Sequence, residues 1–149
     1  MTYELLMANL KDITCLSTFV RLILAAICGG MIGIEQGCRR RAAGLRTHML
    51  VCMGASLVMI TNQYIHTEFG IPDLTRLGAQ VISGIGFLGV GTIIVDKQHQ
   101  VKGLTTAAGL WACACMGLAI GIGFYSGAIM ACIFILLTQT SHINFSYAP

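Results

Sequence analysis

Residues 83–95 read SGIGFLGVGTIIV and place four glycines, Gly84, Gly86, Gly89 and Gly91, inside one apolar stretch. In water this segment would be a poor helix, because each glycine costs ~1 kcal/mol relative to alanine. In a bilayer the backbone must satisfy its own hydrogen bonds, and glycine lets neighbouring helices approach closely. The stretch therefore predicts a membrane helix that packs against other helices.

The composition supports the same interpretation. Of the 149 residues, 56% are hydrophobic and 10% are charged, whereas charged residues make up ~25% of an ordinary soluble domain. The length leaves room for four or five spans of ~20 residues with short loops. We therefore expect a single transmembrane domain over residues 1–149, an all-α polytopic helix bundle of about five transmembrane helices with tightly packed, glycine-rich interfaces. The seven cysteines include no C-x-x-C pair, and we expect them to be small packing residues.

Apolar runs set the predicted spans. Residues 104–138 are largely uncharged, and as one helix they would be ~52 Å long at 1.5 Å per residue, too long for a bilayer. We therefore expect a break near residues 121–127. The predicted spans are residues 19–35, 48–65, 77–95, 104–121 and 124–138, and the spacing of apolar residues in 4–16 predicts a short interfacial helix.

The loops predict the orientation. The loop 36–46 holds four arginines, whereas the loop 66–73 has two acids and neither lysine nor arginine. The positive-inside rule places the first loop in the cytoplasm, together with the basic loop 96–102. Five spans then put the N-terminus outside and the C-terminus in the cytoplasm.

Two predicted spans carry small residues at steps of four, which forms a groove along one side of a helix. Such grooves favour packing or dimerisation over a path for a ligand. The two sets are Ala25, Gly29, Gly33 and Gly37 in the first span, and Gly109, Cys113, Gly117 and Gly121 in the fourth.

Three charged residues lie at the outer ends of the predicted spans. Arg21 is about one turn into the first span, and Asp73 precedes Arg76 at the start of the third. Asp73 is well placed to cap a helix, because its carboxylate would meet free backbone amides. Two interpretations stay open: a capped helix with a snorkelling arginine, or an outer cluster of Asp73, Arg76 and Arg21 that gates or binds an ion.

One face of the third span is polar. Arg76, Gln80, Ser83 and Gly84 share this face by helical spacing. An amide in hydrocarbon needs a partner, so we expect this face to look into the bundle. Gln80 would make an interhelical hydrogen bond or, with Ser83 and Thr92, hydrate a narrow cavity.

A second polar group lies at the predicted cytoplasmic side, with Glu35 and Arg46 around the first loop and Thr105 and Thr106 at the start of the fourth span. Topology and anionic lipid explain the arginines, and Glu35 can pair with Arg46 across the loop. The sequence shows no nucleotide-binding glycine loop, zinc-ligand spacing or nucleophile–base arrangement. We therefore expect no enzyme, no cofactor, no metal site and no nucleic-acid partner.

Three ordered motifs resemble those of a known family. The segments RLILAA (21–26), GGMIGIE (29–35) and AGLRTH (43–48) are similar to the first signature of the MgtC/SapB family of bacterial inner-membrane proteins. AQVISGIGFLG (79–89) resembles the second, and VKGLTTAA (101–108) with Trp111 resembles the third. The resemblance covers about residues 21–137 and corresponds to the membrane domain of longer members, which add a C-terminal soluble domain. The chain departs from the usual pattern at Gln36, Ala42, Leu74 and Gly109.

The resemblance implies a role in adaptation to low magnesium or acid stress and, in some members, in growth inside host cells. It implies regulation of another membrane complex such as the rotary ATP synthase. Our first expectation is a non-enzymatic regulator that acts by helix contact in the lipid of the inner membrane, with a homo-oligomer as a further expectation. The second is a transporter or channel for Mg²⁺ or another cation, although no acidic pair of the kind Mg²⁺ favours lies at membrane depth.

Overall fold

The computed structural model describes residues 13–73, 75–97 and 99–140. Within these ranges the chain forms five helices and one small sheet, which confirms the prediction of an all-α helix bundle. The helices are α2 (Cys15–Cys38), α3 (Leu45–Phe69), α4 (Arg76–Val90), α5 (Leu104–Gly121) and α6 (Tyr125–Thr140), and the strands are β1 (Ile94–Val95) and β2 (Val101–Lys102).

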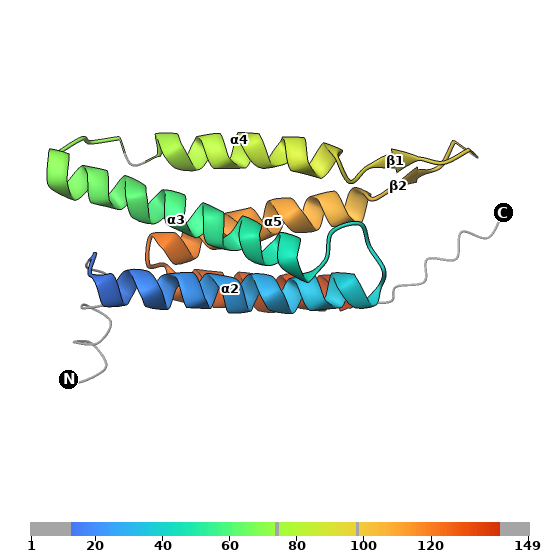
Figure 1. The fold of residues 1–149 in the computed structure, drawn as a ribbon, viewed down its shortest axis with the longest axis horizontal. Helices are drawn as coiled ribbons and strands as arrows, with labels where there is room; N and C mark the ends of the chain where they lie inside the picture. Colours follow the sequence, from blue (N-terminus) through green and yellow to red (C-terminus); the bar gives the residue numbers. More distant parts are fainter. Residues whose placement is uncertain (1–12, 74, 98, 141–149) are drawn as a thin grey trace.

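The helices run along one common direction (Figure 1). The loop between α2 and α3 and the β1–β2 hairpin lie at one end, which we call the inner end, and the connections α3–α4 and α5–α6 lie at the other, the outer end. The two basic loops therefore share one end of the bundle, as the sequence predicts.

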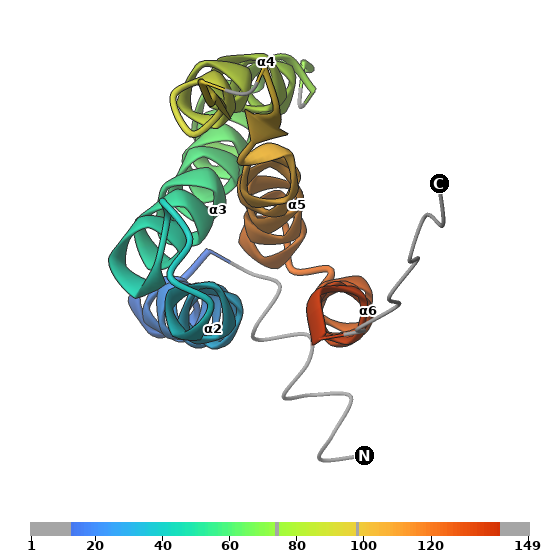
Figure 2. The ribbon, with the colours of Figure 1, turned by 90° about the vertical axis from the view of Figure 1, so that its right-hand side faces the viewer.

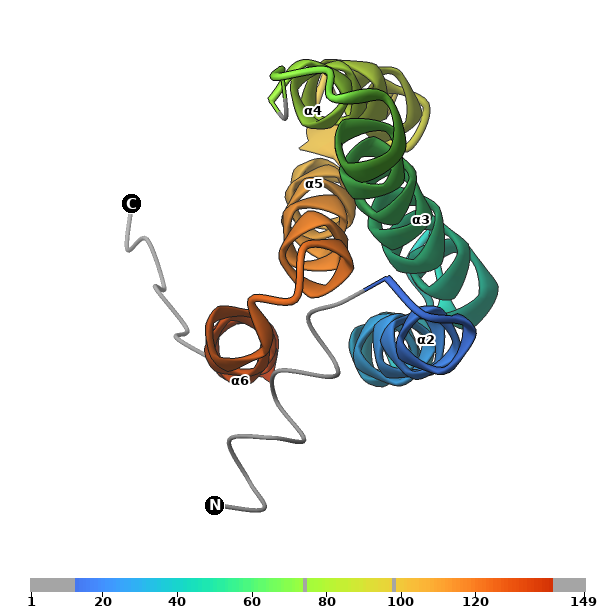
Figure 3. The same cartoon turned by 90° about the vertical axis from the view of Figure 1, so that its left-hand side faces the viewer.

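Helix α5 is the central element, because it contacts each of the other four described helices. Seen from the inner end, α4 lies on one side of the α3–α5 pair, and α2 and α6 lie on the other (Figure 2). The view from the outer end shows the same order (Figure 3). Helix α4 contacts only α3 and α5 to any extent, so much of its surface faces away from the bundle.

Local sequence explains where the helices begin and end. Thr14 and Ser17 form a reciprocal capping box at the start of α2. Helix α3 ends at Gly70, which has the left-handed conformation with φ 65° that glycine adopts without strain. The predicted break after residue 121 is confirmed, since α5 ends at Gly121 and α6 begins at Tyr125.

The predicted span 77–95 is wrong at its inner end. Helix α4 ends at Val90, and Ile94 and Val95 form β1, which pairs antiparallel with β2. Gly103 ends this hairpin at φ 97°, where a side chain would also collide with the Thr92 carbonyl oxygen. The apolar run 92–95 therefore leaves the helix and forms a hairpin.

The remaining spans agree with the prediction to within four residues at each end, and α5 matches it at both ends. Helices α2, α3 and α5 are long and apolar enough to cross a membrane, whereas α4 and α6 are shorter apolar helices of 15 and 16 residues. The predicted interfacial helix 4–16 lies mostly outside the described residues; within it, α2 already begins at Cys15.

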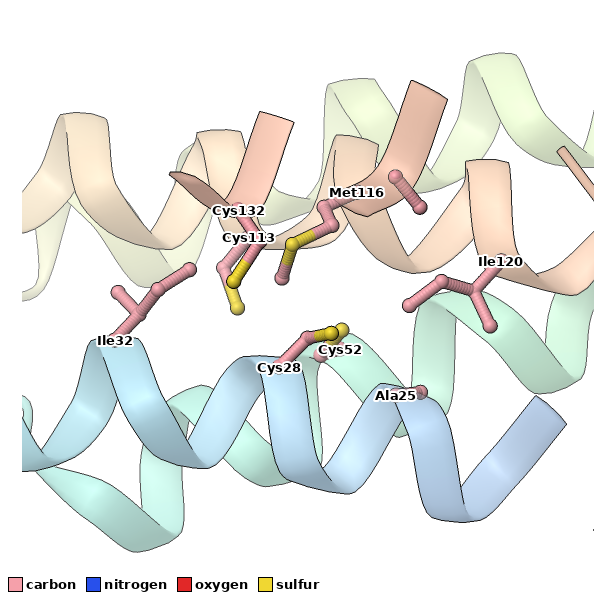
Figure 4. Close-up of a cluster of buried hydrophobic side chains, with 9 residues drawn as sticks. Ala25, Cys28, Ile32, Cys52, Cys113, Met116, Ile120 and Cys132 are labelled. Atoms are coloured by element: carbon pink, nitrogen blue, oxygen red, sulfur yellow. The ribbon is translucent and has the colours of Figure 1, made fainter. Parts of the chain in front are cut away.

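Sulfur-containing side chains fill the centre of the bundle. Cys28, Cys52, Cys113 and Cys132 come from four different helices and pack with Met116 in one buried cluster (Figure 4). All four thiols are free. The interpretation of these cysteines as small packing residues agrees with their burial.

Candidate functional site

The glycine grooves set how closely α2 and α5 approach α3. A Cβ added at Gly33 would lie 2.7 Å from Leu45 Cα, and one at Gly29 would lie 2.7 Å from the His48 carbonyl oxygen. Gly117 and Gly121 similarly meet α3 at the carbonyl oxygens of Cys52 and Ser56. The predicted grooves therefore hold α2 and α5 against α3, although Gly37 has open space around it.

Arg21 joins four helices near the outer end. Its Nη1 donates to Gln63 Oε1 on α3 at 2.9 Å and to the Gly121 carbonyl oxygen on α5 at 2.7 Å, and its Nε donates to the Tyr125 hydroxyl on α6 at 3.2 Å. The side chain is 1% exposed. A guanidinium group fits this position because it is planar and has several N–H donors, which can bond to several oxygens at once.

The structure does not bring Arg21 together with Asp73 and Arg76. Asp73 and Arg76 are exposed at the start of α4, whereas Arg21 is buried in the bundle. The predicted outer cluster of Asp73, Arg76 and Arg21 is therefore wrong, whereas the exposed Arg76 agrees with the other interpretation, a helix start bound by Asp73 with a snorkelling arginine. Helical spacing located Arg21 near the outer end but could not show that it faces the core.

Asp73 binds backbone amides at the start of α4, although the N-cap residue of that helix is Thr75 and not Asp73. Its Oδ1 accepts hydrogen bonds from the backbone N–H of Thr75 at 3.1 Å and of Arg76 at 3.2 Å, and from the Thr75 hydroxyl at 3.0 Å. These bonds to Thr75 favour the charged carboxylate, and they lower the pKa of Asp73.

The polar face of α4 points away from the bundle. Gln80, Ser83 and Gly84 are exposed, and an added Cβ at Gly84 would meet nothing within 4 Å. The face that packs on α3 and α5 carries Gly78 and Ile85 instead. The expectation that the polar face looks into the bundle is therefore wrong within this chain.

An exposed aromatic side chain and a cavity lie on the surface of α4. Phe87, next to the polar face, is 84% exposed. On the other side, a cavity of about 610 Å³ lies between α3, α4 and α5, with Gln63 and Thr75 at its outer end and apolar side chains along the rest.

At the inner end, Glu35 pairs with Arg39, the residue that directly follows α2, and not with Arg46. Arg46 is exposed in the first turn of α3. Glu35 and Arg39 are separated by four positions, a spacing that brings side chains together at the end of a helix. The predicted pairing across the loop is therefore wrong.

The third motif places its residues on different sides of α5. Thr105 is exposed and Trp111 is half-exposed, whereas Thr106 is 1% exposed and faces the interior. The adjoining hairpin is closed by Lys102, whose Nζ donates to Asp96 Oδ2 at 2.6 Å. This bond lowers the pKa of the Asp96 carboxyl.

The structure also reveals buried polar residues that the sequence did not single out as a site. Gln36 and His48 are 1% and 0% exposed, and the side-chain oxygen of Gln139 is buried near the end of α6. Gln36 was noted only as a departure from the family pattern. Its position one turn after Ile32, on the same face as Ala25 and Cys28, is the signal that could have indicated its burial.

No group of three or more His, Cys, Asp or Glu that could hold a metal ion occurs in the described part of the chain.

Apolar helices that pack closely at glycine residues around a central α5 define a polytopic membrane helix bundle. The chain belongs to the MgtC family, whose model matches residues 22–145. It is 45% identical over 124 residues to the Escherichia coli (strain K12) protein named "Putative magnesium transporter YhiD", covering 79% of this chain and 57% of that protein. It is 44% identical over 112 residues to "Protein MgtC" of Brucella abortus (strain 2308), covering 75% of this chain and 45% of that protein.

A Haemophilus influenzae protein of uncharacterized function is 37% identical over 141 residues, covering 91% of this chain and 59% of the relative. The chain thus spans about half the length of the curated relatives it matches. No solved structure matches it.

Proposed function

We propose that this chain is a non-enzymatic protein of the bacterial inner membrane that regulates another membrane complex through helix contacts. Membership in the MgtC family supports a role in adaptation to low magnesium or acid stress. The basic loops at the inner end support a cytoplasmic location for that end, which puts the N-terminus outside and the C-terminus in the cytoplasm.

The observation that carries this proposal is the exposed polar face of α4. Gln80 and Ser83 point away from the chain's own bundle on a helix that contacts only α3 and α5 to any extent. In a bilayer, polar side chains on such a surface gain hydrogen bonds from another helix, and Gly84 lets that helix approach closely. The surface therefore suits a partner helix, either from another membrane complex such as the rotary ATP synthase or from a second copy in a homo-oligomer.

Site-directed photocrosslinking in native membranes tests this proposal. A photoreactive residue at Ser83 is expected to crosslink to a membrane protein, and the added substitution Gln80→Leu is expected to reduce the yield without loss of membrane insertion. A photoreactive residue at Phe134, which is exposed on α6, is the matched control. Equal yields from the two positions would contradict a partner surface on α4.

A cation transporter is the second candidate. The name of the Escherichia coli relative refers to magnesium transport, and the cavity between α3, α4 and α5 reaches the outer end of the bundle. Mg²⁺ sites, however, favour carboxylates and retained water, and the cavity lining contains no acidic side chain. The regulatory function is therefore preferred.

A further inference from the structure

A cavity of about 370 Å³ opens at the inner end of the bundle, between the loop that precedes α3, the last turn of α4 and the first half of α5. Its side-chain lining is apolar apart from the hydroxyls of Thr47 and Thr92. Leu110 and Ala43 are 1% and 2% exposed and form its floor, whereas Phe87 is 84% exposed at its rim. The volume falls within the range of ligand pockets, about 300–1,000 Å³.

The surface around this cavity is also apolar. Leu88 and Val90, which line the cavity, are 48% and 68% exposed on α4. Large exposed apolar patches mark contacts with another apolar surface or with a membrane. Because the chain is a membrane helix bundle, the acyl chains of lipids surround such a surface. An acyl chain that enters the cavity keeps an apolar environment and packs against Phe87, Leu88 and Leu110.

The inner end carries positive charge without a counterion in the chain. Its two acids among the described residues are each bound to a base, Glu35 to Arg39 and Asp96 to Lys102. Three exposed arginines of the α2–α3 loop and the first turn of α3 form no ion pair within the described residues: Arg40, Arg41 and Arg46. The loop and the β1–β2 hairpin lie at the same end of the bundle (Figure 1), so no acid of the outer end balances this charge locally.

Two of the unpaired arginines adjoin the cavity. Arg41 directly precedes Ala42, Arg46 directly precedes Thr47, and both Ala42 and Thr47 line the cavity. Consecutive Cα atoms are about 3.8 Å apart, which is less than the length of an arginine side chain. Either guanidinium group is therefore long enough to reach a group held at the loop side of the cavity. Arginine suits phosphate oxygens in particular, because its planar group donates several N–H bonds at once.

We propose that this cavity binds an anionic phospholipid. One acyl chain lies against Phe87 and Leu110, and the phosphate binds Arg41 and Arg46 at the loop side. An anionic headgroup offsets part of the positive charge of the inner end, whereas a zwitterionic headgroup brings a further positive charge close to the same arginines. Basic pockets between transmembrane helices are a known type of site for anionic headgroups. The site is distinct from the polar face of α4 and does not depend on which side of the membrane the inner end faces.

Lipid binding by the purified, delipidated full chain in detergent tests the proposal. Dioleoyl phosphatidylglycerol is titrated in, and bound lipid is counted by native mass spectrometry. We expect saturable binding of phosphatidylglycerol, and weaker binding of dioleoyl phosphatidylcholine, which has the same acyl chains and no net charge. Glycerol 3-phosphate, which carries the phosphate without an acyl chain, is expected not to bind at the same concentrations.

Variants test the headgroup and the acyl chain separately. Arg41→Gln and Arg46→Gln are each expected to weaken phosphatidylglycerol binding about fivefold, the contribution of one basic residue near an anionic lipid. Arg76→Gln is the matched control, because Arg76 is exposed at the outer end. Ala42→Phe fills the cavity and leaves every charge in place, so it is expected to weaken binding at least as much. Its control is Ala79→Phe, at an exposed position in the first turn of α4.

Three results would overturn the proposal. The first is equal binding of phosphatidylglycerol and phosphatidylcholine. The second is an equal effect of Arg41→Gln, Arg46→Gln and Arg76→Gln, because the net charge of the chain would then attract the lipid. The third is unchanged binding by Ala42→Phe. If a variant does not fold, phosphatidylglycerol with a photoreactive acyl chain is used with the unaltered chain; it is expected to label Phe87 or Leu88, and labelling confined to other residues overturns the proposal.

Discussion

Gly33→Ala tests the close contact between α2 and α3 on which the bundle depends. The new methyl group would lie 2.7 Å from Leu45 Cα and 3.0 Å from the carbonyl oxygens of Gly44 and Leu45. All three atoms belong to the backbone, so the neighbouring helix must move as a unit. Overpacking of this kind costs about 1–3 kcal/mol, and the gain from replacing a helical glycine offsets roughly 0.5–1 kcal/mol of it. We expect a net loss of about 1–2 kcal/mol.

Gly54→Ala is the matched control, because Gly54 lies in the middle of α3 and an added Cβ there meets nothing within 4 Å. This variant is expected to be as stable as the original or more stable by up to about 1 kcal/mol. Thermal unfolding in detergent, followed by circular dichroism, should show a lower midpoint for Gly33→Ala by roughly 2–8 °C. Equal midpoints for the two variants would refute the reasoning about the groove.

Three further predictions follow from the charged residues and the topology. Arg21→Met should lower the free energy of unfolding by about 2 kcal/mol, because it leaves buried oxygens without their donor. The same free energy of unfolding for the variant and the original chain, measured by denaturation in detergent, would contradict this. The pKa of the Asp96 carboxyl should lie below the ordinary value of about 3.9. The bond to Lys102 therefore stabilises the hairpin above that pH and is lost as the pH falls through the lowered pKa. In an NMR titration of Lys102→Met, the pKa of Asp96 should rise toward the ordinary value, and an unchanged pKa would oppose the assignment. An alkaline phosphatase fused after Pro149 should be inactive in whole cells, since that enzyme works only outside the cytoplasm, and full activity would reverse the proposed orientation.

The sequence predicted those features that depend on local spacing and composition. The glycine steps identified the contacts of Gly29 and Gly33, because close helix approach requires small residues at four-residue intervals. The length of the run 104–138 predicted the break before Tyr125, because a single helix of that length does not fit a bilayer. The position of Asp73 before a helix start correctly predicted that its carboxylate binds free backbone amides, although the N-cap residue itself is Thr75.

The wrong predictions concern which of several possible groups a side chain or segment contacts, and the sequence does not show which contact is favoured. The polar face around Gln80 was expected to turn inward, but it is exposed on this chain, and in the proposed function a partner helix would supply the hydrogen bonds that the interior does not. Glu35 pairs with Arg39 because helical spacing brings them together, whereas Arg46 required a contact across the loop. Residues 92–95 are apolar enough to continue α4, and only the pairing with β2 reveals the hairpin.

The buried polar residues Gln36, His48 and Gln139 come from three different helices, α2, α3 and α6. Gln36 and Gln139 lie more than 100 positions apart in the chain. Helical spacing along α2 could have indicated the burial of Gln36, whereas the burial of Gln139 Oε1 depends on how α6 packs at the inner end, which no local pattern encodes.

Magnesium flux into liposomes that contain the purified chain tests the central functional claim most directly. The account of a regulator that acts through the α4 surface predicts that Mg²⁺ uptake equals that of protein-free liposomes, both with and without an imposed membrane potential. Saturable Mg²⁺ uptake that rises with the amount of inserted protein would contradict it and establish the transporter alternative.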